Sequence, residues 1–287
     1  MQNLNSIIEQ LNRVELNPGS TFCDVCEILG TLRGEPLIAP ILAIPESYII
    51  FRGRPVKSFD EVQKVEDISY PPINKCEDFG RANMPRKPMF YGVVAENKMD
   101  MQIDSQIKLC INESCAFLNS PEPNVEYRVV IGIWQNSKPL YGIPVINPDN
   151  NGNRSGINKK IAQEFSSYMD HIDENGGGTD IYSVEEIINF QRFLHHKFTS
   201  PVRNSRGYWV SAKLTDDLIL EKDKNIDGIF YESSKGRTDP KLSECLSLAI
   251  KPSVVDEKLV FCAFCDVVFV FNQGKRQFHV AHYQFRK

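Results

Sequence analysis

The chain has 287 residues, of which 41% are hydrophobic and 24% are charged, as in an ordinary globular protein with a sizeable core. Its formal net charge of −4 provides no overall basic field, which argues against a nucleic-acid partner. No apolar run reaches the roughly 20 residues needed to cross a bilayer, and the longest, over 259–271, is interrupted by Asp266. The N-terminus lacks the pattern of a signal peptide, and eight cysteines in such a chain indicate reduced thiols. We therefore expect a cytoplasmic protein without a membrane contact.

The first half of the chain predicts a helix, a loop-rich segment and a series of strands. Apolar residues at helical spacing predict a helix over 3–13, whereas Pro and Gly throughout 17–45 predict loops. A second helix is expected over 103–118. Runs of β-branched and aromatic residues predict strands at three places: 48–52, 89–94 and 127–134.

The second half mixes helices with short strands and ends in a hairpin. Helices are expected over 157–172 and from Ser183, where Glu186 completes a capping box. A short helix is expected around 213–221. Strands are predicted at 226–231, 246–250, 259–271 and 276–285, the last two forming a hairpin. This mixture favours an α+β fold over a doubly wound parallel sheet.

A cysteine and histidine pattern near the C-terminus has almost the spacing of a zinc finger. Cys262 and Cys265 are followed by His279 and His282, but both pairs fall in predicted strands. Residues three apart on a strand point to opposite faces, and a finger needs its histidines on a helix. Buried thiols and hairpin histidines are therefore the expected roles, although a pairing with the second Cys-x-x-Cys, at 23–26, stays open.

His195 and His196 stand next to each other in a predicted helix. Adjacent side chains on a helix diverge by about 100°, so the two rings do not chelate one ion together. We expect them to be partly exposed residues at the helix end. Elsewhere the chain lacks the Walker loop, the Gly-x-Ser-x-Gly elbow and the His-Glu-x-x-His motif.

Dispersed polar residues at strand and helix ends are the remaining candidates for chemistry. Arg52 ends a predicted strand, Arg81 precedes another, Glu113 borders the buried stripe of a helix, and Ser233 follows a third strand. Taken singly each is a weak indication, because such residues usually face solvent.

The order of these residues resembles the RES domain, a family named for its Arg, Glu and Ser. The segments Gly80-Arg-Ala-Asn-Met-Pro85 and Gly228-Ile-Phe-Tyr-Glu-Ser233 carry the resemblance, together with Ala249-Ile-Lys-Pro252. It implies an α+β fold with an ADP-ribosyltransferase-like β core and surrounding helices. Residues 46–287 would form the catalytic domain with its C-terminal hairpin, and residues 1–45 a helical and loop lead-in.

The resemblance also implies an activity, since members of the family degrade NAD by phosphorolysis or hydrolysis, often as the toxin of a toxin–antitoxin pair. NAD would be substrate rather than cofactor, with no metal, and the partners would be phosphate and a cognate antitoxin or inhibitor protein. The implied catalytic residues are Arg81, Glu113 and Ser233. The implied substrate-binding residues are Arg52, Tyr91 and Asn83.

The chemistry of NAD cleavage fits these residue types. Arginines bind a diphosphate through charge-assisted hydrogen bonds, and a carboxylate stabilises the positive charge that develops on the ribose. The chain departs from the family at Glu232, where Pro usually precedes the Ser, and at Met84-Pro-Arg-Lys87. Two other functions stay open: an ADP-ribosyltransferase that modifies a macromolecule, and a non-enzymatic interaction protein with an inactive NAD pocket.

Overall fold

The computed structural model combines helices with a large sheet, which confirms the predicted α+β class. It describes residues 3–32, 40–95, 103–114, 122, 125–149, 156–174, 182–202, 204–217, 225–232, 246–272 and 277–286. The α-helices are α1 (Leu4–Leu16), α2 (Phe22–Gly30), α3 (Val65–Ile68), α4 (Ile103–Ser114), α5 (Gly156–Glu174), α6 (Val184–Thr199), α7 (Trp209–Thr215) and α8 (Pro252–Lys258). Short 3₁₀ turns are η1 (Phe59–Glu61), η2 (Ile73–Lys75) and η4 (Ser205–Tyr208).

The described strands form one 9-stranded sheet in the order β1-β5-β6-β7-β3-β2-β4-β8-β9. The strands are β1 (Leu42–Ile44), β2 (Ile49–Val56), β3 (Phe90–Ala95), β4 (Glu126–Asn136), β5 (Leu140–Val145), β6 (Gly228–Glu232), β7 (Leu246–Ile250), β8 (Leu259–Asn272) and β9 (Gln277–Arg286). Strands β5 and β6 pair in parallel, and every other pair of neighbours is antiparallel. The sheet is therefore mixed rather than doubly wound.

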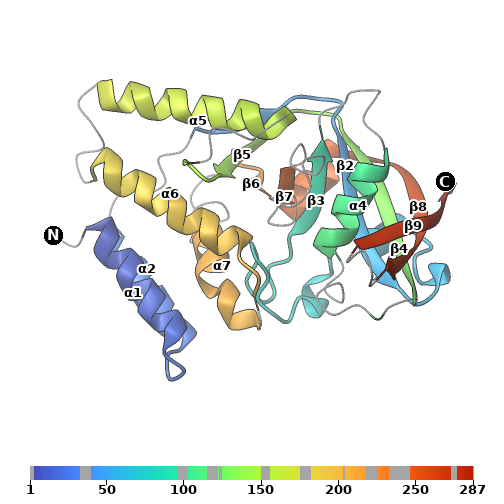
Figure 1. Cartoon of the computed structure of the whole chain (residues 1–287), viewed down its shortest axis with the longest axis horizontal. Coiled ribbons are helices and arrows are strands. Elements are labelled where there is room, and N and C mark those ends of the chain that lie inside the picture. Colours follow the sequence, from blue (N-terminus) through green and yellow to red (C-terminus); the bar gives the residue numbers. More distant parts are fainter. Residues whose placement is uncertain are drawn as a thin grey trace.

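The helices divide between two regions of the sheet (Figure 1). Helix α4 packs on β2 and β3, while α6 packs on β5 and β6. Helix α1 lies against α6, and α2 lies against α7, so that the N-terminal helices form an outer layer. The predicted boundary at residue 45 stays a prediction, but Leu4, Ile7 and Leu11 of α1 are fully buried in the main core.

A second, smaller hydrophobic cluster lies beneath α4. Its buried members come from α4 and from the central strands, and they are Phe51, Ile107, Cys110, Ile111, Val129, Ile131, Cys265, Val267 and Phe269. This cluster fixes α4 on the sheet and thereby fixes the position of Glu113 in the helix's last turn.

Most elements predicted from sequence periodicity are confirmed. The helices over 3–13, 103–118 and 157–172 correspond to α1, α4 and α5, with 115–118 outside the described residues. The helix from Ser183 is α6, where the Ser183 hydroxyl accepts from the backbone N–H of Glu186 at 3.3 Å. The predicted strands correspond to β2, β3, β4, β6, β7, β8 and β9, and the last two pair as the expected hairpin.

The prediction of loops throughout 17–45 is wrong, because this segment contains α2 and β1. Helix α2 begins where the Asp24 carboxylate accepts from the backbone N–H of Thr21 at 2.7 Å, and it buries Val25 and Leu29. The short helix expected at 213–221 begins earlier, at Trp209, and 218–224 lie outside the described residues. Strand β5 was not predicted because Gly142 and Pro144 interrupt it.

The C-terminal cysteines and histidines lie on strands, as predicted. On β8 Cys265 is buried as expected, whereas Cys262 is exposed, so the prediction of a buried thiol is wrong for Cys262. His279 and His282 are exposed on β9. Among the described residues, no group of three or more His, Cys, Asp or Glu side chains could hold a metal ion.

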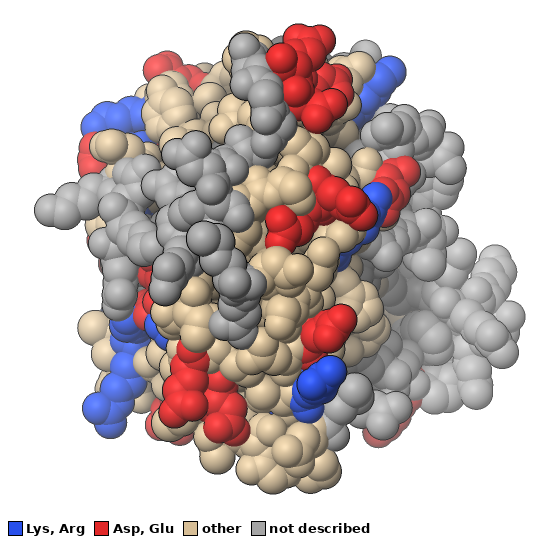
Figure 2. Space-filling model, turned by 90° about the vertical axis from the view of Figure 1, so that its left-hand side faces the viewer, with Lys and Arg blue, Asp and Glu red and all other residues tan. Residues whose placement is uncertain are grey.

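The surface at the α1–α2 end carries interspersed charges. Figure 2 shows acidic and basic side chains of the described residues in separate small groups, between wide uncharged areas. No helix in the described part of the chain is both long enough and apolar enough to cross a membrane.

Gly53 permits the close approach of α4 to β2. A Cβ atom at this position would lie 2.6 Å from the Ser114 hydroxyl and 3.1 Å from the Cys110 sulfur. We expect Gly53→Ala to lower the free energy of unfolding by about 1–3 kcal/mol, measured by urea denaturation, because α4 must shift outward. Gly30→Ala is the matched control, since a Cβ there meets nothing within 4 Å. Equal stability of the two variants would contradict this account of the packing.

Candidate active site

Tyr91 and Tyr231 project from the same face of the sheet. Tyr91 pairs with Ala249 across β3 and β7, and Ala249 pairs with Ile229 across β7 and β6. Tyr231 stands two residues beyond Ile229, so strand alternation places it on that face. The register from Val93 to Phe51 extends this face to β2, where α4 covers it. The sheet therefore presents both tyrosines on the side that carries α4.

Arg52 projects from the opposite face. The next residue is Gly53, where a Cβ atom would point toward α4. Successive side chains on a strand alternate between faces, so the Arg52 side chain points to the other face. There its guanidinium lies 5.1 Å from the centre of the Phe90 ring and donates to the Tyr91 carbonyl at 2.9 Å. Burial lowers the pKa of Arg52 to about 10. The Arg52 side chain thus lies on the face opposite the Tyr91 side chain, and the two groups interact electrostatically.

Arg81 joins the segment before β3 to the C-terminal end of α6. Its Nη1 donates to the carbonyls of Lys197 and Ser200 at 3.2 and 3.4 Å, and Nη2 donates to Ser200 at 3.4 Å. The last carbonyls of a helix carry partial negative charge, which favours a cation at this place. The guanidinium also lies 5.4 Å from the centre of the Tyr208 ring.

Further contacts fix the loop that carries Arg81, which we define as residues 76–88. Lys87 forms an ion pair of 2.6 Å with Asp216, whose side chain is 4% exposed. Phe79 packs its ring 4.8 Å from that of Phe22 in α2 and 6.3 Å from that of Trp209 in α7. The loop is therefore held by α2, α6 and α7 together.

Asn83 and Tyr91 form a hydrogen-bonded support inside this loop. The Tyr91 hydroxyl accepts from the backbone N–H of Ala82 at 2.8 Å and donates to the Asn83 side-chain oxygen at 2.8 Å. The Asn83 amide nitrogen donates to the carbonyls of Asp78 and Met84 at 3.3 and 3.2 Å. Both side chains thus hold the loop's shape, and a substrate contact by Asn83 stays a prediction.

Glu113 reaches the same region from α4. Burial raises the pKa of Tyr231 well above its ordinary value, the Glu113 carboxylate raises it further, and the Arg81 cation opposes the rise. Tyr91 and Tyr208 also act on this hydroxyl electrostatically. Charges act most strongly over short distances and through poorly solvated protein. We call Arg81, Tyr91, Glu113, Tyr208 and Tyr231 the Arg–Tyr–Glu cluster.

His195 and Glu232 form a buried pair at the end of β6. The His195 Nε2 lies 3.1 Å from the Glu232 carboxylate, and these side chains are 6% and 12% exposed. The backbone N–H of Asn147 donates to the same carboxylate at 3.3 Å. The prediction of a partly exposed His195 is therefore wrong, because a buried carboxylate provides a polar partner, whereas His196 is exposed. Ser233, the next residue after Glu232, lies outside the described residues.

The structure brings together four of the predicted site residues, since Asn83 is hydrogen-bonded to Tyr91, and it adds two. Arg81, Tyr91 and Glu113 share the cluster, while Arg52 lies on the other face. Tyr208 and Tyr231 were not predicted, although Tyr231 belongs to the segment Gly228–Ser233 that carries the RES resemblance. The sequence did contain a signal for Tyr231. Side chains two residues apart on a strand point to the same face, so Tyr231 shares a face with Ile229 on β6.

Comparisons with known proteins identify no relative. The chain matches no protein-family model, and it matches no curated protein sequence.

Removal of the Tyr91 hydroxyl should destabilise the loop of residues 76–88. Tyr91→Phe leaves the Ala82 N–H and the Asn83 side-chain oxygen without their partner. We expect the free energy of unfolding to fall by about 1–3 kcal/mol in urea denaturation. Tyr283→Phe, at a residue that is 39% exposed on β9, should change it by less than about 0.5 kcal/mol. A Tyr91→Phe variant as stable as this control would refute the structural role.

Arg52 should be replaceable by an apolar side chain without loss of stability. It has no carboxylate partner among the described residues, and its Nε is buried without a hydrogen bond. We expect Arg52→Met to leave the free energy of unfolding unchanged or raise it by about 1–3 kcal/mol.

Arg286→Met provides the contrast for this measurement. Arg286 pairs with Asp266 at 2.8 Å, and its loss leaves a carboxylate that is 14% exposed without its cation. That variant should lose about 1–3 kcal/mol. A loss of similar size in Arg52→Met would show that the buried guanidinium stabilises the fold.

Proposed function

We propose that the chain cleaves the bond between nicotinamide and ribose in NAD, with water or phosphate as acceptor. The observation that supports this most is the convergence of Arg81 and Glu113 on Tyr231, from a loop and a helix that are separate in sequence. Both residues belong to the set that the RES resemblance assigns to catalysis. In this proposal the mixed sheet and its surrounding helices are an ADP-ribosyltransferase-like core.

The reaction requires little beyond binding and charge stabilisation. The bond between the nicotinamide nitrogen and C1′ of the ribose breaks, and its electron pair stays on nicotinamide, which leaves as a neutral molecule. A water or phosphate oxygen bonds to C1′, and in the case of water a proton passes to solvent. The Glu113 carboxylate would stabilise the positive charge on the ribose in the transition state.

Arg81 would bind the diphosphate while it remains attached to α6. A guanidinium has five N–H groups, and the bonds to Lys197 and Ser200 use only part of them. Ser233 is proposed as the third catalytic residue, since it directly follows β6 in sequence. Substrate contacts by Arg52 and Asn83 remain predictions. Loss of NAD would make the protein toxic wherever a cognate antitoxin or inhibitor protein does not block it.

The test is nicotinamide release from NAD by the purified full-length chain, measured by chromatography with and without phosphate. We expect ADP-ribose in phosphate-free buffer if water is the acceptor, and a phosphorylated ADP-ribose with phosphate if phosphate is. Glu113→Gln should reduce the rate by about 100- to 1,000-fold, because it removes the charge and keeps the shape. Glu126→Gln, at a side chain that is 62% exposed, should leave the rate unchanged.

Ser233 has a matched control beside it in the chain. Ser233→Ala should lose activity and Ser234→Ala should keep it, with circular dichroism confirming that each variant is folded. The proposal fails if the wild-type chain releases no nicotinamide in either buffer, or if Glu113→Gln is as active as wild type.

A further inference from the structure

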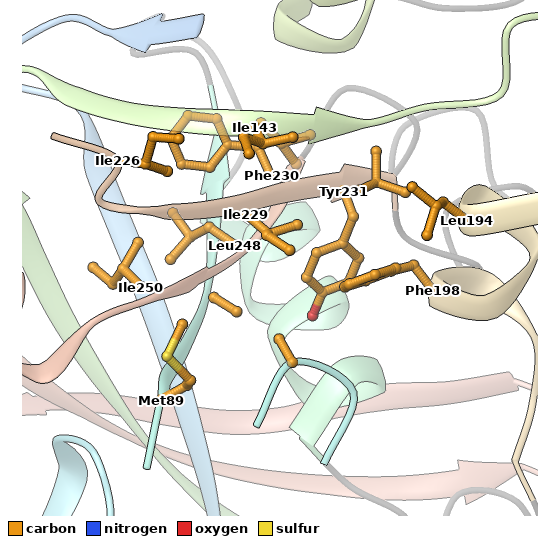
Figure 3. Packing of buried hydrophobic residues seen from close by; sticks show 14 of the residues in the cluster. Met89, Ile143, Leu194, Phe198, Ile226, Ile229, Phe230, Tyr231, Leu248 and Ile250 are labelled. Carbon is orange, nitrogen blue, oxygen red and sulfur yellow. The ribbon is translucent and has the colours of Figure 1, made fainter. Parts of the chain in front are cut away.

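Tyr231 is a buried tyrosine whose hydroxyl has no hydrogen-bond partner in the described part of the chain. The residue is 5% exposed, and its ring packs 5.4 Å from that of Phe198 in α6. Figure 3 shows the ring extending from β6 beside Phe198, with the hydroxyl at the end that points away from the strand. Among the described residues this hydroxyl forms no hydrogen bond. By contrast, the Tyr91 hydroxyl is engaged on both sides by Ala82 and Asn83.

The Tyr231 oxygen is not among the described side-chain atoms that are fully buried without a hydrogen-bond partner, so it keeps some access to solvent while its ring is buried. The ring of Tyr231 already fills the apolar space between β6 and α6, where Leu194 and Phe198 lie (Figure 3). Packing therefore explains the ring and leaves the hydroxyl unexplained. A polar group placed next to Glu113 and Arg81 can instead contact a ligand bound between them.

On the basis of the proposed function, we propose that the Tyr231 hydroxyl donates a hydrogen bond to an oxygen of the nicotinamide–riboside half of NAD. The neighbouring carboxylate of Glu113 accepts hydrogen bonds only, so a ligand oxygen that needs a donor requires a different residue. Tyr231 provides that donor beside the reacting bond. Because Arg81 would bind the diphosphate, the adenosine half of NAD would lie on the Arg81 side of the cluster.

The protonation state of Tyr231 agrees with a donor role. Burial and the Glu113 carboxylate both raise the pKa of its hydroxyl well above the ordinary value. The group therefore keeps its proton throughout the neutral range and does not act as a base. It contributes through hydrogen bonding alone, which Tyr231→Phe removes while it keeps the ring packed on Phe198.

The test compares Tyr231→Phe with Tyr182→Phe in the full-length chain. Tyr182 is also buried, at 3% exposure, and lies outside the Arg–Tyr–Glu cluster. We expect Tyr231→Phe to lower kcat/KM for NAD by about 3- to 10-fold, the effect of one lost hydrogen bond. Tyr182→Phe should match wild type. Thermal unfolding of both variants would verify that the folded population is unchanged.

Inhibition by fragments of NAD locates the contact. Tyr231→Phe should raise the inhibition constant of nicotinamide mononucleotide by a similar factor and leave that of AMP unchanged. The inference is overturned if wild type cleaves NAD and Tyr231→Phe does so equally well, or if both inhibition constants rise together. If wild type itself releases no nicotinamide, the proposed function fails and this inference fails with it.

Discussion

The bond between Arg81 and the end of α6 is the interaction on which the arrangement of the candidate site depends. Arg81 belongs to the loop that leads into β3, whereas α6 lies over β5 and β6. The guanidinium spans these parts by donating to the carbonyls of Lys197 and Ser200. Because helix-end carbonyls lack partners within the helix, the cation satisfies them and is itself held in one orientation. Tyr208 then packs its ring against the same guanidinium.

This arrangement gives Arg81 a structural role that does not compete with binding an anion. A guanidinium fixed by a few of its N–H groups presents the others in a defined direction, without the rotamer entropy that a free arginine loses on binding. The loop around it is equally restrained, by Lys87 on Asp216 and by Phe79 between α2 and α7. The N-terminal helix α2 thereby contributes to the placement of Arg81.

Elements with a strong periodic pattern could be predicted from the sequence, whereas those that depend on tertiary contacts could not. The run Tyr127 to Trp134 is apolar and β-rich because β4 is covered on both faces, and such a run predicts a central strand. Helix α2 stands among residues rich in Pro and Gly, and the cap that begins it is a local contact between Thr21 and Asp24. Pro144 argues against β5 by local preference, and pairing with β1 and β6 overrides that preference.

The same distinction applies to the site. Arg81, Tyr91 and Glu113 could be selected because ordered motifs contain them, but motif order carries no information about sheet faces. Strand register places Arg52 on the face away from Tyr91 and places Tyr231 on the same face as Tyr91. Glu232 departs from the RES pattern, and its reason lies in His195, which is distant in sequence and adjacent in the fold.

Burial connects these placements to chemistry. Tyr231 is buried and acted on by both Arg81 and Glu113, and an electrostatic effect is larger where solvent screens it less. Tyr91 uses its hydroxyl to fix the loop, so its contribution to the cluster is rigidity. The Tyr231 hydroxyl has no hydrogen-bond partner among the described residues, which leaves it available for the ligand contact that we propose. A carboxylate suits a ligand that develops positive charge, and a fixed guanidinium suits negative charge at a distance from it. A protonated hydroxyl suits an acceptor oxygen between these two charges.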